Sequence, residues 1–250
     1  MTYPSAKLKK LALQLVQEAE RRGAKLRLLG GMAIYLSSPA SARQPILQRT
    51  YKDVDFVVDR RGSHHVEAAF EAQGWEPDRR FNALHGATRM LFTYRDAIQA
   101  DLFVGDFVQC HKLSLERRLA LNPVTLTPAD LLLTKLQIHE MNRKDANDVF
   151  MLLLSCSLTA GPGKNKIDVR YLAALTAKDW GWYTTVHDNL AFLRKSLPRG
   201  LKPAEQKVIR TRLDQLRDAI EEAPKSSGWK ARNLIGRRVP WYDEPEEVHR

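Results

Sequence analysis

Residues 49–58 read RTYKDVDFVV, and this stretch decides how the first half of the chain is interpreted. Residues 54–58 form an apolar run that predicts a strand, and Asp53 and Asp55 lie two residues apart at its start. A period of two puts both carboxylates on one face. Two like charges this close disfavour ionisation unless a cation lies between them, and Mg²⁺ prefers carboxylate oxygens. The pair therefore predicts a metal site. The alternative is that Asp53 caps the strand and Asp55 pairs with a surface lysine.

A third carboxylate lies on a later strand. The alternating residues 98–104 predict a strand in which Asp101 stands between Ala100 and Leu102, and residues 89–94 predict a neighbouring strand before a tight turn. A charge within an apolar strand is costly unless it is paired or bound to metal. Three such carboxylates at one sheet edge suit two-metal nucleotidyl transfer.

Upstream of these carboxylates, a glycine pair separates a predicted strand from a predicted helix. Residues 25–29 are the strand, Gly30 and Gly31 follow, and a helical pattern covers residues 32–36. Two glycines at a helix N-terminus let the backbone approach a phosphate, and the helix dipole favours the anion. An ordinary turn is the alternative.

The order of these motifs resembles a known family. Strand, Gly-Gly, helix, Asp-x-Asp and a later strand aspartate are similar to the polymerase-β-type nucleotidyltransferase superfamily. Residues 126–153, LTPADLLLTKLQIHEMNRKDANDVFMLL, resemble its AbiEii-like branch, which includes the MenT-type toxins. The resemblance covers about residues 25–155.

The resemblance implies a short mixed sheet, two Mg²⁺ ions and transfer of a nucleoside monophosphate from a nucleoside triphosphate to an acceptor hydroxyl. Asp53, Asp55 and Asp101 would bind metal, and Asp101 would also be the base. The residues implied to hold the nucleotide are Gly30, Gly31, Lys135 and Asp145. The superfamily commonly has Ser after the first glycine, where this chain has Gly31.

The lysine and the two aspartates of residues 126–153 that the resemblance singles out each have an ordinary structural alternative. Lys135 follows an apolar run in a helix that we expect from Thr127 to about Met141. It would either contact the triphosphate or lie on an exposed helix face. Asp145 and Asp148, one turn apart on the next helix, would orient Lys135 or the nucleotide. Alternatively, Asp145 is the helix N-cap and Asp148 a favourable first-turn charge.

The composition predicts a folded chain with a basic surface. The 250 residues are 44% hydrophobic and 28% charged, which excludes wholesale disorder, and no apolar run is long enough for a transmembrane helix. Lys and Arg number 40 against 29 Asp and Glu, a net charge of +11 that favours a polyanionic partner. The two cysteines form no CxxC pair, which argues against a disulfide scaffold and favours the reducing cytoplasm.

Two domains are expected. Mixed strands and helices up to residue 158 predict an α/β nucleotidyltransferase domain over 1–158, and residues 159–166, rich in Gly, Pro and Lys, look like a linker or loop. Helices expected over 169–175, 182–197 and 203–222 then predict a helical, basic C-terminal domain over 159–250. Residues 224–250 appear less regular in sequence, with packed aromatic side chains.

The C-terminal domain carries a basic cluster that is interleaved with aromatic residues. The cations proposed to contact RNA are Lys230, Arg232, Arg237 and Arg238. Cations beside Trp229, Trp241 and Tyr242 suit RNA backbone and base-stacking contacts. A solvated face with packed tryptophans is the alternative.

Three functions remain open at this stage. The first is nucleotidyl transfer to RNA, with the tRNA 3′ end foremost, in a cytoplasmic toxin that would pair with an antitoxin. The second is the same chemistry on a small hydroxyl compound such as an aminoglycoside, although such compounds are cations and the chain is basic. The third is a catalytically inactive relative that binds nucleotide or RNA.

Overall fold

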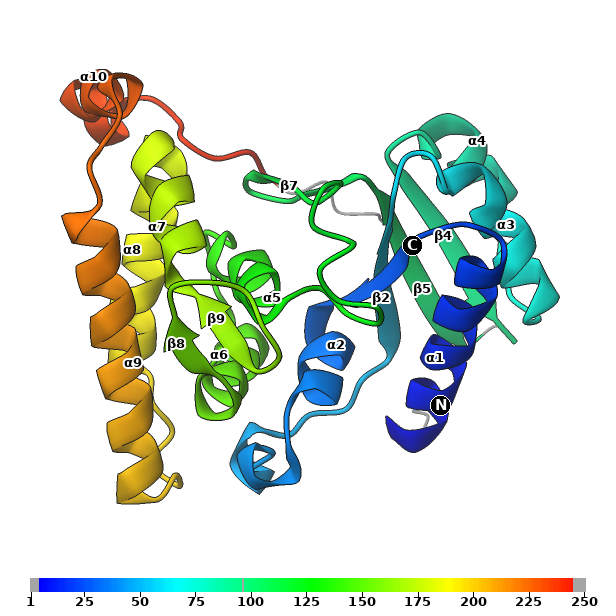
Figure 1. Ribbon diagram of the computed structural model, residues 1–250, viewed down its shortest axis with the longest axis horizontal. Helices are drawn as coiled ribbons and strands as arrows, with labels where there is room; N and C mark the ends of the chain where they lie inside the picture. The colour runs from blue at the N-terminus through cyan, green and yellow to red at the C-terminus, as the bar shows by residue number, and fades with distance from the viewer. Residues whose placement is uncertain (1–4, 96, 245–250) are drawn as a thin grey trace. The chain divides into compact units, whose positions relative to one another are not determined.

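The computed structural model describes residues 5–95 and 97–244, coloured along the chain in Figure 1. These residues form two compact units. Within the described residues, unit 1 comprises 5–37, 49–107 and 113–127, and unit 2 comprises 38–48, 108–112 and 128–244. Among the residues described, no helix is long and apolar enough to cross a membrane.

Unit 1 is built on a five-stranded mixed sheet. In spatial order the strands are β1 (Leu26–Leu29), β2 (Asp53–Val58), β5 (Ile98–Val104), β4 (Arg89–Tyr94) and β3 (Glu76–Pro77). Only β2 and β5 are parallel, and the other neighbours are antiparallel. The expected mixed α/β organisation and the three strands predicted in and beside the acidic motifs are confirmed.

Helices and aromatic side chains hold this sheet. Helix α1 (Ser5–Arg21) packs on β1 and on α3 (Ser63–Ala72). Phe70 of α3 stacks on Phe92 of β4 at 4.1 Å between ring centroids and meets Phe56 of β2 edge-on at 5.7 Å. All three rings are fully buried, and such pairs add to the hydrophobic free energy of burial. The core therefore fixes β2 and β4 to one helix.

Two further helices belong to unit 1, and a two-stranded ribbon is divided between the units because residues 108–112 belong to unit 2. Helix α2 (Gly30–Ser37) directly follows β1, and α4 (Arg79–His85) starts at Asp78, whose side chain accepts a hydrogen bond from the Phe81 amide. The short strands β6 (Asp106–Val108) and β7 (Lys112–Ser114) form a separate ribbon. Helix α4 and strands β3, β6 and β7 were not expected from the sequence, since each is short.

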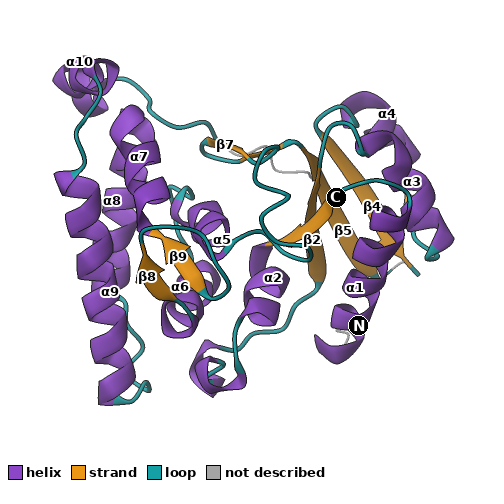
Figure 2. Ribbon diagram, viewed as in Figure 1, coloured by secondary structure: helices purple, strands orange, loops and turns teal. Residues whose placement is uncertain are grey.

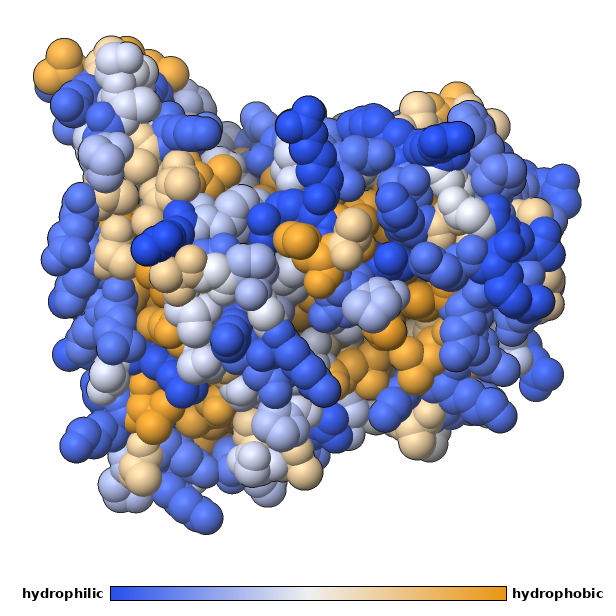
Figure 3. Space-filling view, viewed as in Figure 1, coloured by the Kyte–Doolittle hydropathy of each residue, from blue (hydrophilic) through white to orange (hydrophobic). Residues whose placement is uncertain are grey.

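Unit 2 is mainly helical (Figure 2). Its elements are α5 (Pro128–Leu136), α6 (Arg143–Ser155), β8 (Ser157–Thr159), β9 (Lys166–Asp168), α7 (Val169–Lys178), α8 (Trp180–Lys195), α9 (Pro203–Glu222), α10 (Ser227–Ile235) and three 3₁₀ helices, η1 (Ala40–Ala42), η2 (Pro45–Leu47) and η3 (Gly236–Arg238). Helix α9 buries Ile209, Leu213, Leu216 and Ile220 on one face. The visible edge of α9 is mainly hydrophilic (Figure 3), as an amphipathic surface helix requires.

Several boundaries in unit 2 differ from expectation. Helix α5 ends at Leu136 rather than near Met141, and α6 begins at Arg143 because Asn142 caps it. Residues 160–165 form a loop between β8 and β9, which pair in parallel, and the ends of the expected loop at 159 and 166 belong to these strands. Helix α10 lies in the stretch expected to be irregular. Helices α5 and α6 lie in unit 2, and the domain boundaries 1–158 and 159–250 stay a prediction.

Candidate carboxylate site

The parallel pair β2 and β5 brings two of the three predicted carboxylates opposite each other. Asp55 is in register with Asp101, and Asp53 is in register with Gln99. Directly paired residues of neighbouring strands share a face, as do residues two apart on one strand. Asp53 is exposed and the other two carboxylates are half-buried. The structure therefore gathers all three on one side of the sheet, here called the carboxylate face.

An arginine that the sequence did not single out is paired with Asp101. Arg89 on β4 donates from Nε to Asp101 Oδ1 at 2.8 Å and from Nη2 to Oδ2. Its guanidinium carbon also lies 5.2 Å from the centre of the Phe103 ring. This two-pronged geometry is the strong form of an ion pair and neutralises Asp101. The pair crosses the hairpin between β4 and β5, so only the strand register could have revealed it.

Gly30 makes room for Asp55. Its φ of +69° lies in the left-handed region, and a Cβ atom at this position would overlap Asp55 Oδ2. Glycine is therefore required both by the backbone conformation and by the close approach of the carboxylate. Asp55 thus lies against the start of α2. The expected role of Gly30 toward a triphosphate stays a prediction.

Gly31 makes room for a guanidinium. A Cβ atom there would overlap Arg49 Nη2 and lie 3.0 Å from Tyr51 Cε1. Arg49 also lies over the Tyr51 ring, 4.6 Å from its centre. The serine that the resemblance expects at this position would collide with Arg49 as it stands. The chain therefore has a cation at the glycine pair where the superfamily commonly has a hydroxyl.

Lys135 belongs to a buried ion group in unit 2. Its Nζ lies 2.7 Å from Asp145 Oδ1 and 3.0 Å from Asp148 Oδ2. Its side chain is 10% exposed and that of Asp148 is fully buried. The alternative of a lysine on an exposed helix face is wrong, and so is Asp145 as N-cap, because Asn142 accepts the amide hydrogen bonds that start α6. The expected contact of both carboxylates with Lys135 is present.

The four cations proposed for RNA fall into two groups. Arg232 donates to three backbone carbonyls in the turn after α10, and Arg237 pairs with Asp188 at 2.7 Å. Lys230 and Arg238 are exposed. Arg232 and Arg237 therefore support the local fold, while Lys230 and Arg238 present their charge to solvent.

The carboxylate face fits Mg²⁺ in its donor chemistry. Its three side chains offer only carboxylate oxygens, which this hard cation prefers. Within the described ranges, no set of three or more His, Cys, Asp or Glu side chains is gathered as closely as a metal centre requires. Both oxygens of Asp101 accept from Arg89. Asp101 would therefore have to share its oxygens between Arg89 and a metal, or exchange one for the other.

Comparison with protein-family models and with curated proteins found no match to this chain.

Proposed function

We propose that this chain is a Mg²⁺-dependent nucleotidyltransferase of the polymerase-β type, which transfers a nucleoside monophosphate to a hydroxyl of RNA. One observation carries the proposal. Asp55 stands opposite Asp101 on a parallel strand pair, with its carboxylate against Gly30 at the start of α2. Converging carboxylates beside a glycine-led helix start suit a nucleoside triphosphate and its metal.

Each residue of the carboxylate face has a role in this proposal. Asp53 and Asp55 would hold metal, and two ions would balance the charge of the triphosphate and of the leaving pyrophosphate. Asp101 would accept the proton of the acceptor hydroxyl, whose oxygen forms a bond to the α-phosphorus as the bond to pyrophosphate breaks. Arg49 at Gly31 would hold phosphate oxygens, because a guanidinium matches their geometry.

The resemblance alone supports the other roles. It associates Lys135 and Asp145 with the nucleotide, and a toxin with an antitoxin partner and a cytoplasmic location also follow from it. The net charge of +11 and the exposed Lys230 and Arg238 favour RNA as acceptor, with the tRNA 3′ end as the first candidate.

One observation favours a second candidate, a relative that binds nucleotide or RNA without transferring anything. Arg89 engages both oxygens of Asp101, so the proposed base is neutralised in this structure. If that pair persists with substrates bound, both oxygens of Asp101 stay engaged by Arg89 and are not available to the acceptor hydroxyl. The candidate predicts nucleotide binding without turnover.

Label transfer separates these functions. The full chain is incubated with α-labelled nucleoside triphosphates, Mg²⁺ and total tRNA, alongside Asp55→Asn, Asp101→Asn and the control Glu76→Gln, an exposed carboxylate on β3. We expect labelled RNA with wild type and Glu76→Gln, and a loss of several orders of magnitude with the two aspartate variants. Wild-type turnover by Asp55→Asn would overturn the proposal. Bound but untransferred nucleotide supports the inactive relative, and label on an aminoglycoside alone supports a small-molecule enzyme.

A further inference from the structure

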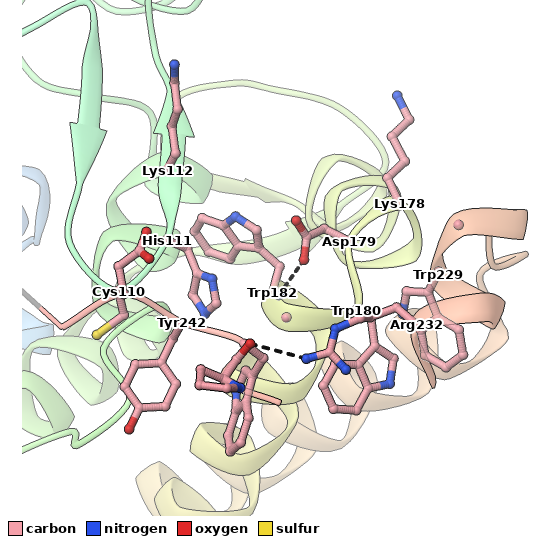
Figure 4. Close-up of a pocket in the computed structure, with 15 residues that line it drawn as sticks. Cys110, His111, Lys112, Lys178, Asp179, Trp180, Trp182, Trp229, Arg232 and Tyr242 are labelled. Atoms are coloured by element: carbon pink, nitrogen blue, oxygen red, sulfur yellow. Dashed lines mark hydrogen bonds between the residues drawn. The ribbon is translucent and has the colours of Figure 1, made fainter. Parts of the chain in front are cut away.

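A cavity of about 570 Å³ lies within unit 2, and its lining includes no residue of the carboxylate face. Its walls come from the β6–β7 turn, the α7–α8 junction, α10 and the segment after η3 (Figure 4). The volume is that of a small-molecule site. Four of the five tryptophans in the chain line it: Trp180, Trp182, Trp229 and Trp241. The lining therefore offers several aromatic faces to a ligand.

Local hydrogen bonds fix the aromatic walls. Asp179 caps α8 by accepting from the Trp182 amide at 3.0 Å, which sets two tryptophans on the first turn of that helix. Ser226 caps α10 and accepts from the Trp229 amide at 3.1 Å. Trp241 Nε1 lies 3.2 Å from Thr185 Oγ1. The rings are therefore held in place before any ligand arrives, which lowers the entropic cost of binding.

The charges around the cavity favour an anion. Figure 4 shows the ammonium groups of Lys112 and Lys178 pointing the same way, away from the aromatic rings. Arg232 adds a third cation over the Trp180 ring, at 4.7 Å. Asp179 and exposed Asp243 are the carboxylates of the lining, so its three cations leave a net charge of +1.

The remaining polar groups of the lining suit a neutral planar ring. Burial lowers the pKa of His111 to about 4, so the imidazole is uncharged at pH 7. The Trp229 Nε1 donor is buried and has no hydrogen-bond partner among the described residues. An unused donor beside aromatic faces suits the ring nitrogens and carbonyl oxygens of a nucleobase.

We infer that this cavity binds a nucleobase that carries a phosphate, with the base against the tryptophans and the phosphate toward Lys178. Stacking of bases on aromatic rings beside a basic rim is the mode by which proteins hold unpaired nucleotides. The ligand is either a free nucleotide or one unpaired nucleotide of an RNA. The choice of RNA as the ligand rests on the proposed function. The assignment of the cavity to a nucleobase that carries a phosphate rests on the lining alone.

Tryptophan fluorescence tests the inference. A Trp75→Phe variant removes the one indole outside the cavity, so that its emission reports on the cavity alone; if it does not fold, wild type is compared with Trp229→Phe. The probes are AMP, ribose 5-phosphate and a five-nucleotide single-stranded RNA. We expect quenching by AMP and by the RNA and little by ribose 5-phosphate, which lacks a base. No quenching by either base-containing probe would overturn the inference.

Matched lysine variants locate the binding. Lys178→Glu reverses a charge at the cavity, and Lys207→Glu makes the same change at an exposed position of α9. We expect Lys178→Glu to weaken AMP or RNA binding at least tenfold and Lys207→Glu to leave it within twofold. Equal affinities in the two variants would overturn the assignment. Tighter binding of the RNA than of AMP, with a steep salt dependence, identifies RNA as the source; the reverse identifies a free nucleotide.

An Asp55→Asn variant separates this inference from the proposed function. It should lose label transfer and bind the probes as wild type does, since Asp55 does not line the cavity. Probe binding without transfer by wild type would leave the cavity assigned and remove the proposed enzyme. Transfer without probe binding would remove the cavity assignment alone.

Discussion

The carboxylate face of unit 1 and the buried ion group of unit 2 each combine aspartates with a basic side chain, and they differ in their contact with solvent. The first sets Arg89 against Asp101, with Asp53 and Asp55 on the same side of the sheet. The second sets Lys135 between two aspartates on α6.

Solvent contact decides what each group can do. Asp53 is exposed, and the side chains of Arg89 and Asp101 are 20% and 15% exposed to solvent. Asp148 is fully buried. Charges that water can reach can change partners at modest cost, whereas a buried charge that loses its partner is strongly destabilising. Water can therefore hydrate a charge left unpaired on the carboxylate face, whereas it does not reach Asp148 in the buried ion group.

The largest effect is expected in the buried ion group. Lys135→Met removes the ammonium that lies between Asp145 and the fully buried Asp148, and it should lower the free energy of unfolding by about 3–5 kcal/mol. Urea unfolding measures it, with Lys144→Met, at an exposed position of the same motif, as the control. A loss no greater than that of the control would mean that the two groups do not differ as described.

A second buried group of unit 2 should make stability depend on pH. The folded-state pKa of His111 is lowered to about 4 by burial, so the unfolded state binds more protons between about pH 4 and 6.5. Stability should therefore rise with pH across that window, by up to about 1.4 kcal/mol per unit, and fall on acidification. Unfolding of His111→Gln should show a flatter profile than wild type, and the exposed His64→Gln should not.

A smaller effect is expected at the ion pair of the carboxylate face. Arg89→Met should cost about 1–2 kcal/mol, because water can hydrate the Asp101 that is left behind. The same variant tests the inactive-relative candidate: if the pair blocks Asp101, label transfer should increase. A loss of stability as large as that of Lys135→Met would contradict the difference in solvent contact between the two groups.

The smallest effect on stability is expected from Asp55→Asn. The amide keeps the shape of the carboxylate beside Gly30 and the position is half-buried, so the free energy of unfolding should change by no more than about 0.5 kcal/mol. Thermal or urea unfolding beside wild type measures this. A clear destabilisation would assign Asp55 to the fold rather than to a ligand.

The sequence predicts the strands of the acidic motifs because their apolar runs and alternation are strong local signals. Asp53, Asp55 and Asp101 share a face for the same reason. The partner of Asp101 needed the register between β4 and β5, and a lone arginine at position 89 carries no local sign of it. Arg49 over Gly31 likewise depends on a three-dimensional approach.

The aromatic cavity cannot be predicted from local sequence patterns. Its walls come from four segments between residues 110 and 243, and no periodicity links them. Helix α10 was missed because Pro224 and the Ser-Ser-Gly that follows read as a loop, although Ser226 is a normal N-cap signal. Of the four tryptophans, Trp229 and Trp241 belong to the basic cluster of the sequence, whereas the convergence of all four is a property of the packed helices.

Binding of Mn²⁺, a spectroscopically visible substitute for Mg²⁺, tests the central claim that the carboxylate face is the metal-dependent nucleotide site. Mn²⁺ is titrated by electron paramagnetic resonance, with a non-hydrolysable nucleoside triphosphate present, into wild type, Asp55→Asn and Glu76→Gln. We predict that wild type and Glu76→Gln bind with equal affinity and that Asp55→Asn loses at least tenfold. Binding by Asp55→Asn as tight as by wild type would contradict the account.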